Sequence, residues 1–407
     1  MSVSKIKVSL DFGTSVIEVG TLVEQNQAVF FRFHPSFLDK NLNISPFKLK
    51  QTNDIIPCPK EPFDGLPGVF NDSVPDGWGR ILLDRKLIEK GINPGEINAL
   101  DRLSLVGKKA QGALIYEPED NENIAYPTTF DLDEIAKEST ELLINGNSAF
   151  LDDLYHLGGN SVGARPKVLV NYSEKDDLFG PHSNGDFEAW IIKFSSLNDL
   201  KDSAKIEYAF YLLATNCGIE MHPSKLFTSE KGHSFFGTKR FDREKNKRLH
   251  FHSACGLLYD NSRYSTLDYG HVMDASNKLE KNSLACEKVF RLAVFNVLGN
   301  NMDDHSKNLG FLMDENGNWR FAPAYDLTFS PSRGNYQSLS VSGIYQNIGL
   351  KELMNLASYF EVANRKEIIT EIKESFSNWR SVSRELEINT NESSIVEKAI
   401  DLKLKNF

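Results

Sequence analysis

The sequence predicts an α+β protein with more than one lobe or domain, in which strands dominate the N-terminus and helices the C-terminus. At 407 residues the chain exceeds the length that one hydrophobic core usually supports. Residues 1–33 contain three runs in which apolar and polar side chains alternate, as in a small antiparallel sheet. Beyond residue 348 helical runs alternate with polar turns, and 389–394 provides caps for a last helix.

The middle of the chain mixes helical and strand-like segments. A helical pattern covers 76–92, and 112–118 is strand-like. The polar stretch 118–129 is the best candidate for a linker, and 131–156 predicts one helix followed by a shorter one. We therefore expect an N-terminal subdomain to end at residue 128.

Composition excludes several classes of protein. A formal net charge of −10 means that direct nucleic-acid binding would need a local basic patch, and the most basic stretch, 239–248, is mixed in sign. The four cysteines are unclustered, which favours reduced thiols over a disulfide or zinc framework. There is no signal-peptide pattern and no apolar run of about 18 residues. We expect no membrane segment and a cytoplasmic location.

The most informative residues are two aspartates and an asparagine. Asp303 and Asn308 lie in N-M-D-D-H-S-K-N (301–308), after an apolar helical run at 285–300. An Asp followed five residues later by Asn is the spacing of a protein-kinase catalytic loop, where the Asp orients or deprotonates the acceptor hydroxyl and the Asn holds Mg²⁺. Asp326 follows a predicted hairpin, where a kinase keeps its other metal-binding Asp. The ordered combination predicts phosphoryl transfer.

Upstream segments supply candidates for phosphate binding. The glycine-rich segment 157–167 allows backbone amides to face phosphate oxygens, although an ordinary glycine turn has the same composition. The apolar strand pattern at 189–194 contains Lys193, which needs an anionic partner such as ATP phosphate unless it reaches solvent at a sheet edge. Glu207, expected in the first turn of a helix over 205–220, suits either the helix dipole or an ion pair with Lys193. A strand over 234–243 leads into the expected connector between lobes.

These motifs together resemble the HipA family of bacterial toxin Ser/Thr kinases, the toxins of type II toxin–antitoxin pairs. The motifs that carry the resemblance are F-N-D-S-V-P-D-G-W-G-R (70–80), G-G-N-S-V-G-A-R-P-K (158–167), W-I-I-K-F (190–194), K-R-F-D-R (239–243), D-D-H-S-K-N (303–308) and A-Y-D-L-T (324–328). The resemblance implies a two-lobed protein-kinase-like fold with a small β-rich N-terminal subdomain and a mainly helical C-terminal lobe. It implies a HipA-type subdomain over 1–128 and a kinase-like domain over 129–407, with the C-terminal lobe starting at about 244.

The resemblance also implies ATP and Mg²⁺ as cofactors and assigns site residues. Asp303 would be the catalytic base, with His305 beside it and next to the phosphates, and Asn308 and Asp326 would be metal ligands. The ATP-binding residues would be Gly159, Asn160, Ser161, Val162, Gly163, Lys193, Lys239, Phe241 and His305. Two positions depart from the family pattern: Asn160 stands where some members have an autophosphorylated serine, and Lys239 stands where glutamate is frequent. Ser161, one step later, is the candidate for autophosphorylation.

The implied partners are a protein substrate, such as an aminoacyl-tRNA synthetase, and a helix-turn-helix antitoxin through which DNA is reached indirectly. Two other functions compete with this interpretation. L-D-F-G-T-S (10–15) is similar to a phosphate motif of the actin and sugar-kinase superfamily, which phosphorylates small molecules, but a plain hairpin turn is the simpler reading. A pseudokinase scaffold would keep the fold without activity, and the intact site residues argue against it.

Overall fold

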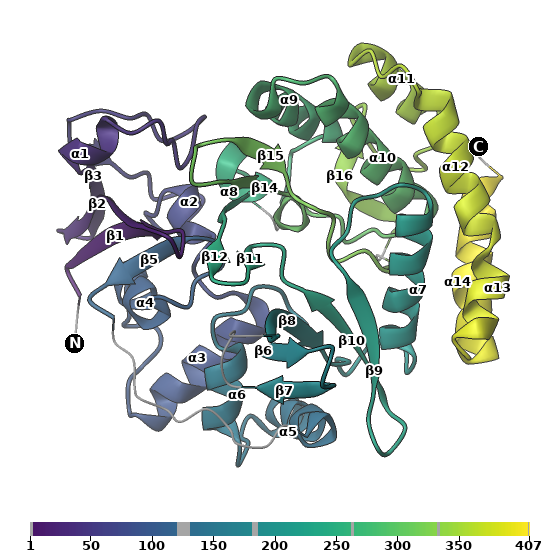
Figure 1. The fold of residues 1–407 in the computed structure, drawn as a ribbon, viewed down its shortest axis with the longest axis horizontal. Coiled ribbons are helices and arrows are strands. Elements are labelled where there is room, and N and C mark those ends of the chain that lie inside the picture. The colour runs from purple at the N-terminus through teal and green to yellow at the C-terminus, as the bar shows by residue number, and fades with distance from the viewer. Residues whose placement is uncertain (1–2, 120–130, 181–185, 262–263, 332–333, 406) are drawn as a thin grey trace.

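The computed structural model describes residues 3–119, 131–180, 186–261, 264–331, 334–405 and 407. It combines a β-rich N-terminal part with a helical C-terminal part, which confirms the predicted α+β class. Figure 1 shows the N-terminal sheet at one end of the molecule and the last helices at the opposite end, with a second sheet in the lower centre of the view.

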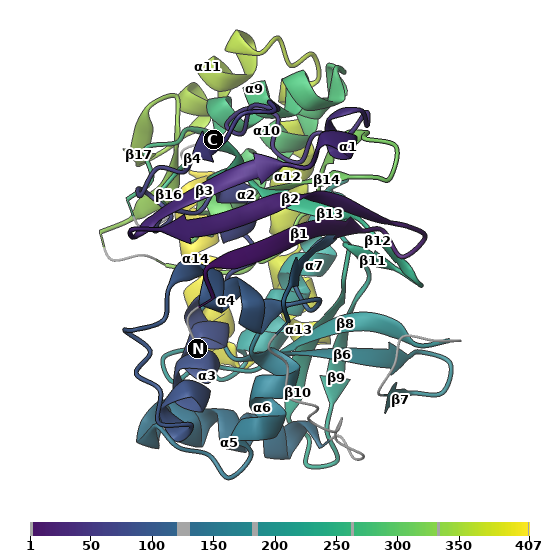
Figure 2. The ribbon, with the colours of Figure 1, turned by 90° about the vertical axis from the view of Figure 1, so that its left-hand side faces the viewer.

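An antiparallel five-stranded sheet with the order β4-β3-β2-β1-β5 organises the N-terminal part. Because side chains alternate across a strand, Ile6, Val8 and Leu10 all point into the core. In Figure 2 this sheet faces the viewer and lies across the rest of the molecule. The elements are β1 (Lys5–Asp11), β2 (Val16–Gln25), β3 (Ala28–Phe33), α1 (Pro35–Leu38), β4 (Ile56–Pro57), α2 (Gly68–Asn71), α3 (Gly77–Glu89), α4 (Ala99–Val106) and β5 (Leu114–Glu117).

A second antiparallel sheet with the order β7-β6-β8-β10-β9 follows in the chain. Its core is aromatic, since the Tyr172, Trp190 and Phe227 rings lie with centroids 4.9 to 5.8 Å apart. The elements of this region are α5 (Leu132–Asn145), α6 (Leu151–Gly158), β6 (Lys167–Ser173), β7 (Leu178–Gly180), β8 (Glu188–Lys193), α7 (Ser203–Asn216), β9 (Ser224–Thr228) and β10 (Ser234–Lys239).

The C-terminal part is built around α10, which is buried along most of its length. This part consists of short strand pairs and helices. They are β11 (Arg243–Glu244), β12 (Lys247–Arg248), β13 (His250–Ser253), α8 (Ala254–Leu258), α9 (Tyr269–Glu280), α10 (Leu284–Leu298), β14 (Gly310–Met313), β15 (Trp319–Phe321), β16 (Tyr336–Val341), β17 (Ile344–Gln346), α11 (Leu350–Tyr359), α12 (Arg365–Ser377), α13 (Trp379–Glu385) and α14 (Thr390–Leu404). Within the described residues, no helix is both long and apolar enough to cross a membrane.

The predicted subdomain boundary at 128/129 falls on 120–130, outside the described residues. The helix predicted at 76–92 is α3, but it does not simply cover the N-terminal sheet. Its Trp78 and Leu82 share a core with Leu142 and Leu154 of α5 and α6. A helix from the N-terminal part of the sequence therefore packs with the helices that precede the second sheet.

Candidate active site

Two lysines from neighbouring strands meet at one end of the second sheet. Lys193 is the last residue of β8, and the register places it opposite Lys167, the first residue of β6. Like charges that face one another across a strand pair repel, so anions are needed nearby. The chain supplies two: Glu207 Oε1 lies 2.6 Å from Lys193 Nζ, and Asp326 forms a second ion pair with the same ammonium group.

The expectation that Glu207 lies in the first turn of its helix is wrong. Because α7 already begins at Ser203, its first turn contains no acidic residue and the interaction with the helix dipole is lost. The ion pair with Lys193 therefore accounts for the burial of the Glu207 carboxylate, which is only 5% exposed. Arg165 lies on the other side, with its Nη1 3.9 Å from Glu207 Oε2.

The charges in this cluster fix the protonation states of Lys193 and Asp326. Burial on its own would lower the pKa of Lys193, but Asp326 and Glu207 outweigh it and the pKa is raised. Burial would raise the pKa of Asp326, but Lys193 and Lys167 outweigh it and the pKa is lowered. Lys193 therefore stays an ammonium and Asp326 stays a carboxylate near neutral pH.

The adjacent residues Asp303 and Asp304 have opposite environments. Asp304 is buried and accepts hydrogen bonds from the Tyr269 hydroxyl at 2.7 Å and from the Ser338 amide at 2.9 Å. The Asp303 side chain is 65% exposed. Asn308 Nδ2 donates to the backbone oxygen of Asp303 at 2.8 Å, which closes the five-residue loop. Asp304 thus anchors the loop. The sequence by itself identifies only Asp303 and does not predict this role.

His305 and Asp326 define the electrostatic surroundings of Asp303. Although its side chain reaches solvent, the protein around Asp303 removes part of its hydration, and this raises its pKa; His305 opposes the rise and Asp326 adds to it. His305 Nε2 lies 3.8 Å from Asp303 Oδ1. Its Nδ1 is buried and has no hydrogen-bond partner among the described residues. The direction of this shift suits a general base, and one ring nitrogen of His305 is not used in a hydrogen bond within the described residues.

The chemistry of the donor set fits a magnesium–nucleotide complex better than a metal site made by protein alone. Among the described residues, no group of three or more His, Cys, Asp and Glu side chains could hold a metal ion. Mg²⁺ is usually bound through one or two protein ligands together with phosphate oxygens and water. Asp326 offers a carboxylate, and Asn308 has a side-chain oxygen left because its NH₂ group faces Asp303.

The glycine-rich segment 157–167 is folded against the start of α3. Gly163 N donates to Asp76 Oδ1 at 2.5 Å. The amide and hydroxyl of Ser161 both donate to Gly158 O, at 2.9 and 2.6 Å, and the side chain is buried. The sequence predicts that loop amides face ATP phosphates. In this structure the amides of Ser161 and Gly163 are instead bonded within the protein.

The remaining loop residues lie close to this contact. Gly159 caps α6 and its amide donates to Tyr155 O at 2.8 Å. Val162 O accepts a hydrogen bond from Lys167 Nζ at 2.5 Å. Asn160, at the position of the family's serine, is partly exposed between them. Lys167 thus connects the loop to the lysine pair at the end of the sheet.

The connector contributes an aromatic cluster. The Phe241 ring centroid lies 5.3 Å from that of Tyr325 and 5.8 Å from that of Phe251. Because Tyr325 directly precedes Asp326, this cluster joins the connector to the proposed metal-binding loop. The Lys239 ammonium pairs with Glu188 of the neighbouring strand β8.

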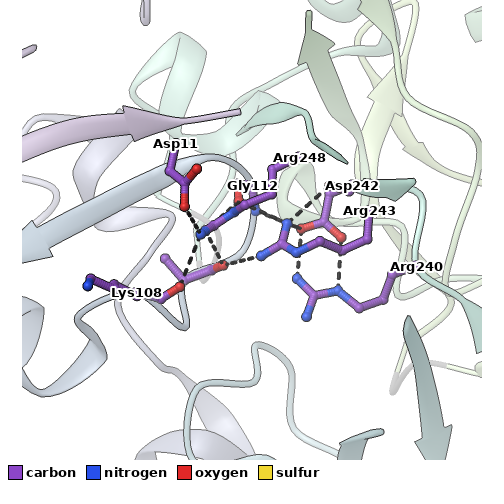
Figure 3. Close-up of polar contacts among 8 residues, drawn as sticks. Asp11, Lys108, Gly112, Arg240, Asp242, Arg243 and Arg248 are labelled. Atoms are coloured by element: carbon purple, nitrogen blue, oxygen red, sulfur yellow. Dashed lines mark hydrogen bonds and ion pairs between the residues drawn. The ribbon is translucent and has the colours of Figure 1, made fainter. Parts of the chain in front are cut away.

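Asp242, directly after the connector, is the centre of a buried ionic cluster (Figure 3). Its carboxylate pairs with Arg240 at 2.7 Å and with Arg243 at 2.6 Å, and it accepts a hydrogen bond from Gly112 N at 2.7 Å. Arg248 donates to Gly112 O at 2.9 Å. Since Gly112 belongs to the N-terminal part, the cluster attaches that part to the connector. Within the mixed-sign stretch 239–248, Asp242 is thus buried in ion pairs, whereas 244–247 are exposed.

The D-F-G-T motif is a hairpin turn between β1 and β2. Asp11 accepts a hydrogen bond from Gly13 N at 2.8 Å and pairs with Arg248 at 3.3 Å. A Cβ atom on Gly13 would lie 1.7 Å from Asn246 O, so the turn is packed directly against the backbone of the β11–β12 hairpin. The side chain and the turn are occupied by the chain itself, which favours the plain turn over a phosphate site.

A pocket of about 410 Å³ opens beside Asp303. Its lining is mostly uncharged and includes the exposed rings of Tyr264 and Tyr336 as well as Tyr345. It lies next to the catalytic loop, because Met302 and Asp303 form one of its walls. Sequence reasoning did not foresee this pocket, whose walls come from distant segments.

Comparisons with known proteins agree with this architecture. Residues 12–117 match the HipA N-terminal domain, and residues 160–380 match the HipA-like C-terminal domain. The HipA structure from a Shewanella oneidensis MR-1 complex of HipA, HipB and operator DNA has a TM-score of 0.66 at 16% identity, over 98% of this chain and 96% of that one. The Helicobacter pylori proinflammatory kinase CtkA is similar over 54% of this chain and 88% of its own, with a TM-score of 0.38 and 15% identity. No match was found among the curated proteins.

Both domain models match in order along the chain, and the C-terminal model alone covers more than half of the 407 residues. The S. oneidensis HipA shares the fold over nearly the whole length of both proteins. The β-rich N-terminal part and the helical C-terminal part are therefore parts of one known architecture, and the chain belongs to the HipA family.

Proposed function

We propose that this chain is an ATP- and Mg²⁺-dependent Ser/Thr protein kinase. The observation that carries the proposal is the convergence of Lys193, Glu207 and Asp326 from three separate segments, beside a loop that presents Asp303. Lys193 and Asp326 are each other's partners in this structure, and both have the charge that a magnesium–ATP complex needs. Phosphoryl transfer depends almost entirely on such positioning and charge neutralisation.

In the proposed reaction each residue has one role. Lys193 and Lys167 would hold ATP phosphates, and Asn308 and Asp326 would hold Mg²⁺, which would supply charge neutralisation for the transferred group. Asp303 accepts the proton of the attacking hydroxyl, and its raised pKa suits that task. His305, whose Nδ1 has no hydrogen-bond partner among the described residues, would donate to a phosphate oxygen, and Phe241 would contact the adenine.

The acceptor hydroxyl is proposed to approach from the pocket beside Asp303. That pocket lies on the catalytic loop and is lined by Tyr264, Tyr336 and Tyr345. Two of its lining rings, Tyr264 and Tyr336, are exposed, as is typical of surfaces that contact other proteins. A protein substrate is therefore favoured over a small-molecule acceptor of the sugar-kinase type, and the packed Gly13 turn supports the same choice.

We further propose that the chain is the toxin of a toxin–antitoxin pair. The fold matches a HipA that was solved with HipB and operator DNA. By analogy, a helix-turn-helix antitoxin would neutralise this chain and link it to DNA indirectly. The substrate would be a translation protein such as an aminoacyl-tRNA synthetase, whose phosphorylation inhibits translation, and a proteome-wide phosphorylation screen would identify it.

Producing the chain alone in bacteria is expected to arrest growth, because an unrestrained kinase would inhibit translation. The Asp303→Asn variant, produced to the same level, is expected to be harmless. Growth curves with matched protein levels test this prediction. Normal growth with soluble, ATP-consuming wild-type protein would reject the toxin assignment and leave a kinase with another role.

Incubation with ATP is expected to place a phosphate on Ser161. Its hydroxyl is buried and donates to Gly158 O, so the loop must leave α3 before modification. The phosphate adds a charge of about −1.5 to −2, which Arg165 and Lys167 would attract, and this would hold the loop away from ATP. Mass spectrometry should find the phosphate in the wild type and not in the Asp303→Asn variant. An unmodified loop alongside a phosphorylated substrate would remove this switch.

A further inference from the structure

We infer that Asp76, from the N-terminal part of the chain, is a positioning residue. It fixes the glycine loop (157–167) and the catalytic loop (301–308) relative to one another. The inference rests on the proposed kinase function and assigns a role to the P-D-G-W-G-R stretch, which the proposed mechanism does not use. It means that the N-terminal part is a component of the active site rather than only a neighbouring subdomain.

The Asp76 carboxylate joins two loops that belong to different parts of the fold. Its Oδ1 accepts a hydrogen bond from Gly163 N at 2.5 Å, and its Oδ2 pairs with the Lys307 ammonium. Gly163 lies in the glycine loop, and Lys307 lies between His305 and Asn308 in the catalytic loop. Both side chains of the ion pair are mostly buried, with 31% of Asp76 and 22% of Lys307 exposed.

Helix capping does not explain this placement. Asp76 is the N-cap residue of α3, a position where an aspartate ordinarily accepts a hydrogen bond from the first turn of its own helix. Here its side chain makes no capping hydrogen bond. Both oxygens are directed to the two loops instead, so the side chain serves the loops rather than the helix that it begins.

The backbone around Asp76 is fitted to the glycine loop. Trp78 N donates to Gly163 O at 2.9 Å. Gly77 has φ +47°, and a Cβ on it would lie 2.5 Å from Gly163 O. A Cβ on Gly79 would lie 2.3 Å from Ser161 O. The two glycines therefore allow a direct backbone contact, and any shift of α3 would move the loop with it.

The other end of the contact reaches the metal-binding loop. The Tyr325 hydroxyl donates to Lys307 O at 2.7 Å, and Tyr325 directly precedes Asp326. Asp76 is thus connected through Lys307 to the segments that carry Asp303 and Asp326. Because a shift of about 1 Å in a reacting group can lower a rate about 100-fold, this connection would set the distance between the phosphate donor and the base.

The test compares Asp76→Asn with Asp84→Asn. The Asp76→Asn side chain would keep an acceptor for Gly163 N but lose the ion pair with Lys307. Asp84 is the matched control: it lies on α3, is 29% exposed, and pairs with Arg80 at 2.8 Å and with Arg102 at 3.7 Å rather than with either loop. Asp76→Asn is expected to lower kcat by about 10- to 100-fold with a smaller change in KM for ATP, whereas Asp84→Asn stays within about 2-fold of wild type. Lys307→Met is expected to match Asp76→Asn, and the double variant is expected to be no worse than either.

A second measurement does not depend on activity. Hydrogen exchange followed by mass spectrometry, without nucleotide, is expected to show faster exchange of segments 157–167 and 301–309 in Asp76→Asn and no change in Asp84→Asn. Unchanged exchange, or a kcat equal to that of Asp84→Asn in an active enzyme, overturns the inference. If the wild type shows no kinase activity, the proposed function fails and the exchange data alone decide the role of Asp76.

Discussion

Replacing Asp303 with asparagine is expected to lower phosphoryl transfer by about 10²- to 10⁴-fold, the usual contribution of a general base. Asparagine keeps the shape of the side chain and removes the basic oxygen. The loop should hold its form, because Asn308 bonds the backbone oxygen of Asp303 and Asp304 anchors the loop from inside. Affinity for Mg²⁺–ATP should therefore stay close to that of the wild type.

The matched variant Asp326→Asn is expected to be impaired already in the binding of Mg²⁺ and ATP, before phosphoryl transfer. Asp326 has φ +56°, a conformation that asparagine tolerates, so the backbone should be preserved. The variant loses the carboxylate that pairs with Lys193 and is proposed to bind Mg²⁺. Activity should fall together with Mg²⁺-dependent ATP affinity. Radiolabelled phosphate transfer and calorimetric ATP binding separate the two variants, and near-normal activity of Asp303→Asn would contradict the assignment of the base.

The Asp242→Asn substitution is expected to reduce the free energy of unfolding by about 3–5 kcal/mol, the effect of breaking a buried ion pair. The carboxylate is 3% exposed, and its loss leaves the Arg240 and Arg243 guanidinium groups buried without their shared partner. Asp11→Asn is the control: Asp11 pairs with Arg248 in the same cluster but is 25% exposed, so about 1 kcal/mol or less is expected.

The stability difference between wild type and Asp242→Asn should depend on pH. Burial by itself would raise the pKa of Asp242, but Arg240 and Arg243 outweigh it and the pKa lies below its ordinary value of 3.8. Because the pKa of Asp242 is depressed in the folded state, its carboxylate stabilises the fold at pH values above 3.8. This stabilisation is lost as the pH falls through the pKa of the folded state. Denaturation of wild type and Asp242→Asn at neutral and at strongly acidic pH measures this change in the stability difference. Equal denaturation midpoints for Asp242→Asn and Asp11→Asn at neutral pH would contradict the predicted loss of stability.

Much of the candidate site depends on local relationships that the sequence reveals by itself. The five-residue interval from Asp303 to Asn308 spans one short loop, so the spacing alone predicts that the two side chains act together. Lys193 and Glu207 lie 14 residues apart, at the end of a strand and in the following helix, and their observed ion pair was one of two predicted roles for Glu207. The alternating pattern of residues 1–33 likewise predicts the sheet, since the period of two belongs to the strand itself.

Only the tertiary structure decided which distant residues complete the site. Asp76 and Lys307 are 231 residues apart, and Asp242 and Gly112 are 130 apart. Nothing in the spacing of either pair predicts contact, because periodicity specifies which face of an element is buried but not which other element covers it. Asp304 has no spacing that marks it in the sequence, and only the packing of Tyr269 and Ser338 around it makes it an anchor. The sequence by itself thus determined the local chemistry of the loops, and long-range packing determined how they are held together.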